Sequence, residues 1–299
     1  MKESLWRPKS RVQWVKEGDK NTKFFHLAAS NRRRKNFIGC IKTSSGMVTD
    51  VNGIRAEAVN DFTALFSESD YSRPSLLIGN ITSLPPSSAE LLEAPFSYEE
   101  IQAAVWYCGN GKAPGPDGFN FSFFKASWDF IWPDIMRMVD EFFRTSCLSK
   151  GNNSSFVTLA PKISGSSLLL DYRPISLIGS LYKIVAKTLA NRLRVVIGQV
   201  IGSQQSAFIR GRQILDGALI AREAIHSPKK KNHGGFMFKV DFQKAFNSVN
   251  LRFLLSIMEQ MGFGPRCCGW IRDCLTAAKI SVLINGSPTQ QFSIAEGLR

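Results

Sequence analysis

Apolar and polar positions along the chain follow two kinds of spacing. Apolar residues that recur every three to four positions predict helices at about residues 1–28, 51–66, 97–109, 119–145, 180–200, 212–226, 251–261 and 265–278. Short alternating or continuous apolar runs predict strands at about residues 37–50, 155–163, 236–242, 280–284 and 292–294. Because helices and strands mix without a regular βαβ rhythm, the pattern indicates an α+β fold.

Local signals refine this pattern at three places: one helix start, one turn and one loop. Ser97 and Glu100 match the S-x-x-E capping box at the start of a helix. Asn285-Gly286 is typical of a two-residue turn between the strands of a hairpin. The run at residues 110–118 holds too much Gly and Pro for regular structure, which predicts a loop. It does not match the phosphate-binding G-x-x-x-x-G-K-[ST] pattern, because an alanine follows its lysine.

Composition suggests three segments. A basic N-terminal extension covers residues 1–70, a linker rich in Ser and Pro covers residues 71–95, and a folded domain covers residues 96–299. With 44% apolar residues, the chain is able to bury a sizeable core.

The charge of the chain favours a polyanionic partner. The formal net charge is +14, and the first 35 residues contain eleven Lys or Arg against three acidic residues. Cations that neutralise phosphates release counterions, which makes the cluster Arg32, Arg33, Arg34 and Lys35 a candidate nucleic-acid contact. The alternative is a solvated basic surface, with the neighbouring aromatic residues on the buried face of a helix.

The sequence carries no signal for a membrane or for secretion. No apolar run approaches the roughly 18 residues of a membrane span, and no signal peptide or transmembrane segment is predicted. The six cysteines lack the paired spacing of a zinc site, which favours a reduced, intracellular protein. The run Lys229-Lys230-Lys231 leaves a nuclear location open, although such a run is more often a solvated loop.

Asp241 lies at the end of the apolar run at residues 236–242. An acidic residue that leaves a strand can present a metal ligand, but a site for two metal ions needs several carboxylates. Taken alone, Asp241 is better explained as a turn or cap residue.

Several sequence blocks occur together in one order. They are Trp14-Val-Lys-Glu-Gly-Asp-Lys-Asn-Thr-Lys-Phe-Phe-His26, Gly111-Lys-Ala-Pro-Gly-Pro-Asp-Gly118, Leu159-Ala-Pro-Lys162, Asp171-Tyr-Arg-Pro-Ile-Ser-Leu177, Gln205-Ser-Ala-Phe-Ile-Arg-Gly-Arg212, Lys239-Val-Asp-Phe-Gln-Lys-Ala-Phe-Asn-Ser-Val249 and Glu296-Gly-Leu-Arg299. In order and spacing they resemble the reverse transcriptases of plant LINE-type (non-LTR) retrotransposons, over nearly the whole chain. The block at residues 111–118 has no clear chemical task in this pattern, and we interpret it as a structural loop.

The resemblance implies a right-hand polymerase fold, in which residues 96–299 hold the fingers and the first part of the palm. It implies an RNA-directed DNA polymerase that extends a DNA primer on an RNA template, with dNTPs and Mg²⁺. Asp241 matches the first catalytic aspartate, and the backbone carbonyl of Phe242 is expected to add a metal ligand. Phe246 matches the bulky residue that excludes a ribose 2′-hydroxyl.

Five further residues receive expected roles from the resemblance. Lys162 and Arg173 match fingers cations that grip the incoming triphosphate, and their alternative is a basic strand edge. Gln205, Arg210 and Arg212 match a block that contacts the template and helps to shape the nucleotide pocket. Their alternative is a helix N-terminus with solvated arginines.

The family pattern continues after the terminal Gly-Leu-Arg299 with Gln-Gly-Asp-Pro and an aromatic-x-Asp-Asp turn that bears two more catalytic carboxylates. Neither motif occurs in the 299 residues, and Asn247 stands where the family usually has Asp. We therefore expect a truncated chain that is inactive on its own. The alternatives are a nucleic-acid-binding remnant without catalysis, with unknown oligomeric state, and a product that misfolds.

Overall fold

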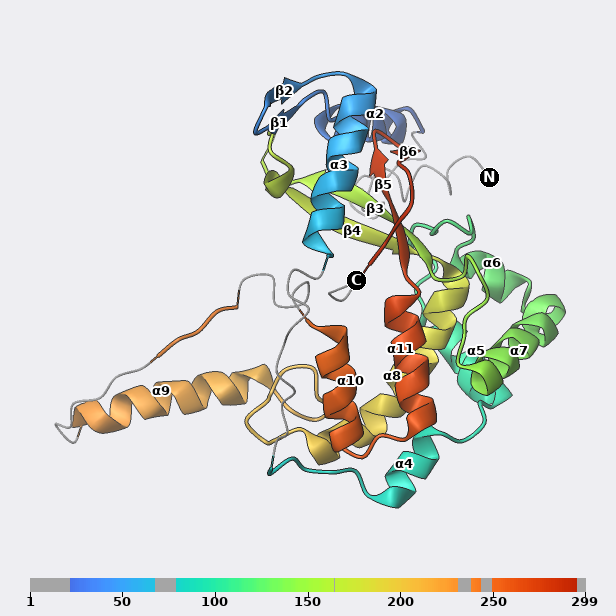
Figure 1. Ribbon diagram of the computed structural model, residues 1–299, viewed down its shortest axis with the longest axis vertical. Coiled ribbons are helices and arrows are strands. Elements are labelled where there is room, and N and C mark those ends of the chain that lie inside the picture. Colours follow the sequence, from blue (N-terminus) through green and yellow to red (C-terminus); the bar gives the residue numbers. More distant parts are fainter. Residues whose placement is uncertain (1–21, 68–78, 164, 231–237, 243–248, 295–299) are drawn as a thin grey trace.

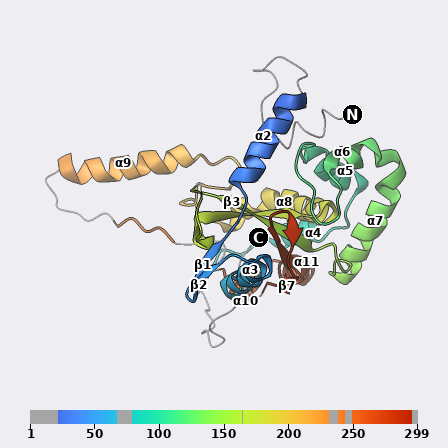
Figure 2. The same ribbon diagram turned by 90° about the horizontal axis from the view of Figure 1, so that it is seen from above.

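The computed structural model describes residues 22–67, 79–163, 165–230, 238–242 and 249–294 (Figure 1). The described residues form three parts. The sheet lobe contains α2, α3 and the strands, and the helical lobe contains α4 to α8, α10 and α11. The arm consists of α9 together with residues 238–242, and it projects from both lobes in two perpendicular views (Figures 1 and 2).

A mixed five-stranded sheet forms the centre of the sheet lobe. Its strands are β3 (Ser154–Pro161), β4 (Tyr172–Ile178), β5 (Lys279–Ile284), β6 (Ser287–Pro288) and β7 (Phe292–Ser293). The order is β4-β3-β5-β6, β7 also pairs with β5, and only β3 and β5 run parallel among these pairs. The predicted hairpin turn is confirmed, because Asn285 (φ 52°) and Gly286 (φ 89°) both adopt the left-handed conformation that such a turn requires.

Helix α3 (Val51–Leu65) covers one face of this sheet. Its Ile54, Ala58 and Phe62 pack with Val157 and Val282 of the central strands in one apolar cluster. The N-terminal extension therefore shares a core with the sheet. The small hairpin of β1 (Ile41–Thr43) and β2 (Gly46–Val48) confirms the strand pair predicted around Ser-Ser-Gly.

Helix α2 (Thr22–Lys35) lies on the other side of the sheet from α3 (Figure 2). The prediction ended this helix before the basic cluster, whereas the structure places Arg32 to Lys35 in its last turn. Cations are favourable there, because the helix dipole is negative at its C-terminus. Residues 1–21 of the predicted helix lie outside the described residues.

The helical lobe forms a second apolar core. Its helices are α4 (Pro86–Leu92), α5 (Tyr98–Tyr107), α6 (Phe121–Ala126), α7 (Trp128–Thr145), α8 (Ser180–Val200), α10 (Leu251–Gln260) and α11 (Pro265–Thr276). Ile101, Phe142, Ile184 and Trp270 have no exposed surface. Residues 71–95 were predicted to be a linker, but α4 lies within this segment and Leu92 is buried in the core.

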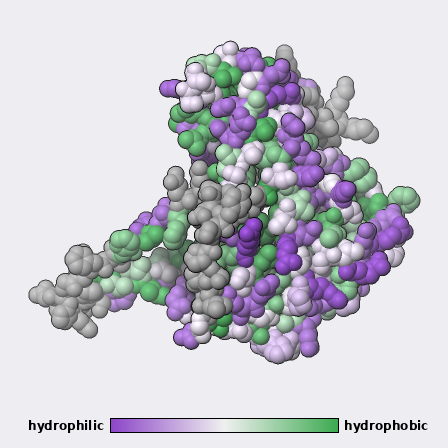
Figure 3. All heavy atoms as spheres, viewed as in Figure 1, coloured by the Kyte–Doolittle hydropathy of each residue, from purple (hydrophilic) through white to green (hydrophobic). Residues whose placement is uncertain are grey.

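The arm keeps its apolar side chains on the surface (Figure 3). In α9 (Ile214–Lys230), Ile214 is 70% exposed and Ile220 is also 70% exposed. The strand prediction for residues 236–242 is wrong at residues 238–242, which are assigned to no strand; the two residues before them lie outside the described part. A strand needs a partner, yet Phe238 is 92% exposed and Phe242 is 76% exposed.

None of the helices in the described ranges is both long and apolar enough to cross a bilayer.

Candidate nucleotide and nucleic-acid site

The hairpin of β3 and β4 places Lys162 and Arg173 on one face of the sheet. In its register Arg173 is paired with Ala160, and Lys162 follows two positions later, directly after the end of β3. Since side chains alternate along strands, Ala160 and Arg173 share the face that does not carry Val157. Lys162 continues this alternation, because its backbone N–H still pairs with the opposite chain at Asp171. Tyr172, the neighbour of Arg173, is buried on the opposite face, in the core beneath α3. The fold therefore places these two cations on the same face of the sheet.

The two cations differ in what they already contact. Lys162 Nζ donates a hydrogen bond of 2.7 Å to the carbonyl of Leu170, in the short 3₁₀ helix Leu169–Asp171 between the strands. The backbone N–H of Lys162 donates to the Asp171 carbonyl at 2.7 Å. Arg173 is exposed, and its guanidinium has no ion-pair partner among the described residues. Arg173 is thus the cation that is free to hold an anionic ligand.

Asp241 is not brought to these cations. Asp241 and Phe242 are exposed on residues 238–242, a segment that Figures 1 and 2 show apart from the five-stranded sheet. No three potential metal-ligating side chains come together within the described ranges. Phe246 lies outside those ranges. The structure therefore places the expected fingers cations on one face, without the expected metal ligand beside them.

Arg212 has a structural role in the loop after α8. Its Nη1 donates to the carbonyls of Gly202 at 2.6 Å and Gln205 at 2.8 Å, and its Nη2 donates to the carbonyl of Ile201 at 2.9 Å. This fork holds the loop against the C-terminal end of α8. Gln205 and Arg210 are exposed on the same loop, so neither lies at the helix N-terminus considered from the sequence.

The loop at residues 110–118 is anchored to the start of α8. The Asp117 carboxylate accepts a hydrogen bond from the backbone N–H of Ser180, and Ser180 Oγ donates to the Phe119 carbonyl at 2.8 Å. At Gly115, an added Cβ would lie 2.4 Å from backbone atoms of Ile178 and Gly179. Asp117 therefore satisfies a free N–H of the helix, and the interpretation as a structural loop agrees with the contacts.

Lys125 anchors the other end of the same loop. Its Nζ donates to the carbonyl of Trp106 at 3.0 Å, to the carbonyl of Cys108 at 2.8 Å and to Asn110 Oδ1 at 2.8 Å. These carbonyls belong to the end of α5, where a cation is favourable. Nearby, burial lowers the pKa of Lys183 on α8, and the Asp117 carboxylate opposes this change.

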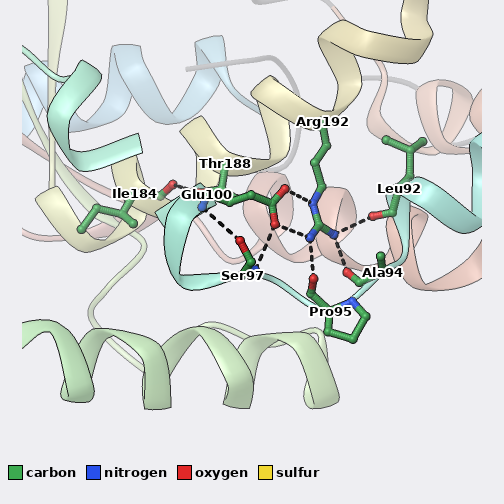
Figure 4. Close-up of polar contacts among 8 residues, drawn as sticks. All are labelled: Leu92, Ala94, Pro95, Ser97, Glu100, Ile184, Thr188 and Arg192. Atoms are coloured by element: carbon green, nitrogen blue, oxygen red, sulfur yellow. Dashed lines mark hydrogen bonds and ion pairs between the residues drawn. The ribbon is translucent and has the colours of Figure 1, made fainter. Parts of the chain in front are cut away.

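Arg192 is an anchoring residue that the sequence did not reveal (Figure 4). Its Nε donates to Glu100 Oε1 at 2.8 Å and its Nη2 to Glu100 Oε2 at 2.7 Å, a bidentate pair between α8 and α5. The same guanidinium donates to the carbonyls of Leu92, Ala94 and Pro95. The hydrogen bonds from Arg192 hold the pKa of the Glu100 carboxyl below its usual range.

Comparisons with known proteins relate the chain to reverse transcriptases and to products of transposable elements. Residues 161–299 match the family described as reverse transcriptase (RNA-dependent DNA polymerase). The chain is 29% identical over 294 residues to the transposon TX1 uncharacterized 149 kDa protein of Xenopus laevis, covering 97% of this chain and 22% of that protein. It is 22% identical over 213 residues to the retrovirus-related Pol polyprotein from type-1 retrotransposable element R2 of Popillia japonica, covering 69% of this chain and 28% of the relative.

The chain thus spans only 22% and 28% of the length of these two relatives. Its match to the family begins within the β3–β4 hairpin, next to Lys162, and includes α8, α9 and residues 238–242. Both relatives are named as products of transposable elements. Residues 161–299 are therefore similar to the reverse transcriptase family, and nearly the whole chain is similar to a protein of a transposable element.

Proposed function

We propose that this chain contributes the fingers and first palm residues of an RNA-directed DNA polymerase, which extends a DNA primer on an RNA template. The observation that carries the proposal is the register of the β3–β4 hairpin, which sets Lys162 and Arg173 on one exposed face of the sheet. Two cations on one rigid hairpin suit a triphosphate, since a strand fixes its side chains better than a loop does.

Arg173 is the stronger of the two proposed triphosphate contacts. A guanidinium presents a planar fork that matches two phosphate oxygens, whereas an ammonium acts as a point charge. Lys162 already donates one hydrogen bond to the Leu170 carbonyl, so part of its capacity is used within the hairpin. Gln205 and Arg210 remain proposed template contacts, and Arg212 acts on them through the loop it holds.

Reverse transcriptases use divalent metal ions, and Asp241 with the Phe242 carbonyl is the proposed contribution of this chain to that site. Carboxylate and carbonyl oxygens are the ligands that Mg²⁺ prefers. Asp241 belongs to no group of three potential metal-ligating side chains among the described residues, so these residues alone do not form a site for two metal ions. The proposal for Lys162 and Arg173 therefore stands on phosphate binding and does not depend on the metal.

The test is equilibrium binding of a labelled dNTP to the full chain in the presence of an RNA template annealed to a DNA primer. Arg173→Ala is expected to weaken dNTP binding roughly 10- to 150-fold, which corresponds to the loss of charge-assisted hydrogen bonds. The dNTP affinity of Arg173→Lys should fall between those of Arg173→Ala and the unaltered protein, because lysine keeps the charge and loses the planar fork. Lys162→Ala should weaken binding less than Arg173→Ala.

Arg137→Ala is the matched control, because Arg137 is a 78% exposed arginine of α7 that pairs with Asp134. It removes the same side chain from a surface outside the proposed site. Equal dNTP binding by Arg173→Ala, Arg137→Ala and the unaltered protein would reject the assignment of Arg173 to the triphosphate.

A further inference from the structure

A groove of about 490 Å³ separates the end of α2 from the sheet. Arg33, Asn36 and Phe37 form one wall, and Thr158 and Leu283 of the central strands contribute to the other. None of the described residues that line this groove is acidic. The groove therefore combines a cation, an aromatic ring and polar side chains in a surface that favours an anionic ligand.

The backbone next to Phe37 is fixed to the sheet. Asn285 Oδ1 accepts a hydrogen bond of 2.9 Å from the Ile38 N–H, and Asn285 Nδ2 donates to the Ile38 carbonyl at 2.9 Å. Ile38 is only 3% exposed, whereas the adjacent Phe37 is 60% exposed. An apolar ring is thus held at the surface by a buried neighbour on one side and by the end of a helix on the other.

Arg33 supplies the charge of this groove. It lies in the last turn of α2, between other cations, and the described residues offer it no acidic partner. Arg34 differs, because its guanidinium donates to Asn31 Oδ1 at 2.8 Å on the same helix. Arg33 is therefore the cation of the cluster that both lines the groove and keeps its donors available.

The groove and Arg173 lie on the same side of the sheet. Thr158 and Leu283 are paired across β3 and β5, next to the inward-facing pair of Val157 and Val282. Strand alternation therefore turns Thr158 and Leu283 to the face away from α3. Two positions beyond Thr158 on β3 is Ala160, the partner of Arg173. A chain-like ligand in the groove can continue along this face toward Arg173.

We propose that this groove binds a segment of single-stranded nucleic acid, with one base stacked on Phe37 and a neighbouring phosphate at Arg33. An aromatic ring with an adjacent cation is a sequence-tolerant way to hold an unpaired strand. The bases of a duplex are already stacked on one another, so the ring selects an unpaired strand. The inference rests on the proposed function, in which such a strand is the template that leads to the nucleotide site.

The first test is binding of a fluorescein-labelled 12-nucleotide single-stranded RNA to the full chain, followed by fluorescence anisotropy. Phe37→Ala is expected to weaken binding roughly 5- to 150-fold, the range for removal of one stacking platform. Phe37→Trp should retain binding, since it preserves a stacking ring. Phe130→Ala is the matched control, because Phe130 is an 85% exposed phenylalanine on α7 in the helical lobe.

The second test is the salt dependence of the same binding. Arg33→Ala is expected to make the slope of log K against log salt shallower by about 0.7, the value for one phosphate of a single strand. Phe37→Ala should lower affinity without changing this slope. If Arg33 only stabilised α2 through the helix dipole, Arg33→Ala would lower the melting temperature and leave the slope of log K against log salt unchanged.

These results are separable from those for the proposed function. If Phe37→Ala loses RNA binding and Arg173→Ala weakens dNTP binding, both proposals are supported. If Phe37→Ala loses RNA binding but Arg173→Ala binds dNTP as well as the unaltered protein, the groove proposal is supported and the nucleotide site is rejected. RNA binding that is equal in Phe37→Ala, Phe130→Ala and the unaltered protein, all with unchanged thermal unfolding, overturns the groove proposal.

Discussion

The helical lobe and the arm differ in what surrounds their apolar side chains. In the helical lobe Ile101, Phe142 and Trp270 have no exposed surface, whereas Ile214 and Ile220 of α9 are each 70% exposed. Both parts carry apolar residues at helical spacing, so sequence pattern alone does not separate them. The difference is made by long-range packing, which buries the apolar side chains of the helical lobe and leaves those of α9 exposed.

The same contrast applies to the functional motifs. Asp241, which the resemblance predicts to be a metal ligand, lies on the exposed segment of the arm. Asp117 and Arg192, which received no chemical role from the sequence, are each fixed by several hydrogen bonds in the helical lobe. A motif thus identifies chemistry without revealing how firmly the fold holds it.

A pair of identical substitutions should produce the largest difference between the two parts. Leu189 on α8 is 5% exposed, and Leu219 on α9 is 59% exposed. Leu189→Ala is expected to lower the free energy of unfolding by roughly 2–5 kcal/mol, through lost transfer energy and a new cavity. Leu219→Ala should change it by less than about 0.5 kcal/mol, as is typical of surface positions.

Urea unfolding followed by tryptophan fluorescence measures both variants. Each Trp from position 106 onward lies in the helical lobe, so this signal reports the cooperative unit that contains Leu189. A large loss of stability in Leu219→Ala would mean that the arm packs against another surface in solution and does not differ from the helical lobe in this respect.

Removal of the Arg192 side chain should have the next largest effect. Arg192→Ala leaves the carbonyls of Leu92, Ala94 and Pro95 without their donor and leaves Glu100 unpaired. We expect the free energy of unfolding to fall by about 2–3 kcal/mol, below the range for a fully buried pair, because the Glu100 side chain is 36% exposed. Arg194→Ala, an exposed arginine on the same helix, is the control. Equal stability of the two variants would show that the hydrogen bonds of Arg192 contribute no net free energy.

Local signals in the sequence predicted much of the secondary structure. The capping box at Ser97 is present, with Ser97 Oγ accepting from the Glu100 N–H at 3.2 Å and the Glu100 side chain accepting from the Ser97 N–H at 3.0 Å. Strand β4 was missed because Pro174 lies inside it, and a proline usually argues against a strand. The exception follows from topology, because β4 is an edge strand of the sheet.

The anchors of the candidate site were beyond sequence reasoning for a different reason. The bond from Arg192 to Glu100 joins residues 92 positions apart, and the bond from Ser180 to Asp117 spans 63 positions. No periodicity or short motif reports such pairings. The strand at residues 236–242 was predicted from its apolar pattern alone, and such a pattern does not supply the partner that a strand requires.

The pH dependence of stability should show the smallest effect and tests the Arg192 network without altering Arg192. Hydrogen bonding to Arg192 keeps the pKa of Glu100 lower in the folded protein than in the unfolded chain, where a glutamate titrates at about 4.3. The unfolded state therefore binds the proton more readily. The stabilisation is complete above the unfolded pKa and is lost as the pH falls through the lower, folded pKa.

Urea unfolding of the unaltered protein and of Glu100→Gln at pH 7 and at pH 3 isolates this contribution, because all other carboxylates are common to both. The unaltered protein should lose more stability on acidification than Glu100→Gln, whose side chain at this position does not titrate. In an Arg192→Met background the difference between the two should shrink, since the main cause of the lowered pKa is gone. An equal loss in the unaltered protein and Glu100→Gln would place the stabilising role of Arg192 in its bonds to the carbonyls of α4 and the following turn, and not in its pair with Glu100.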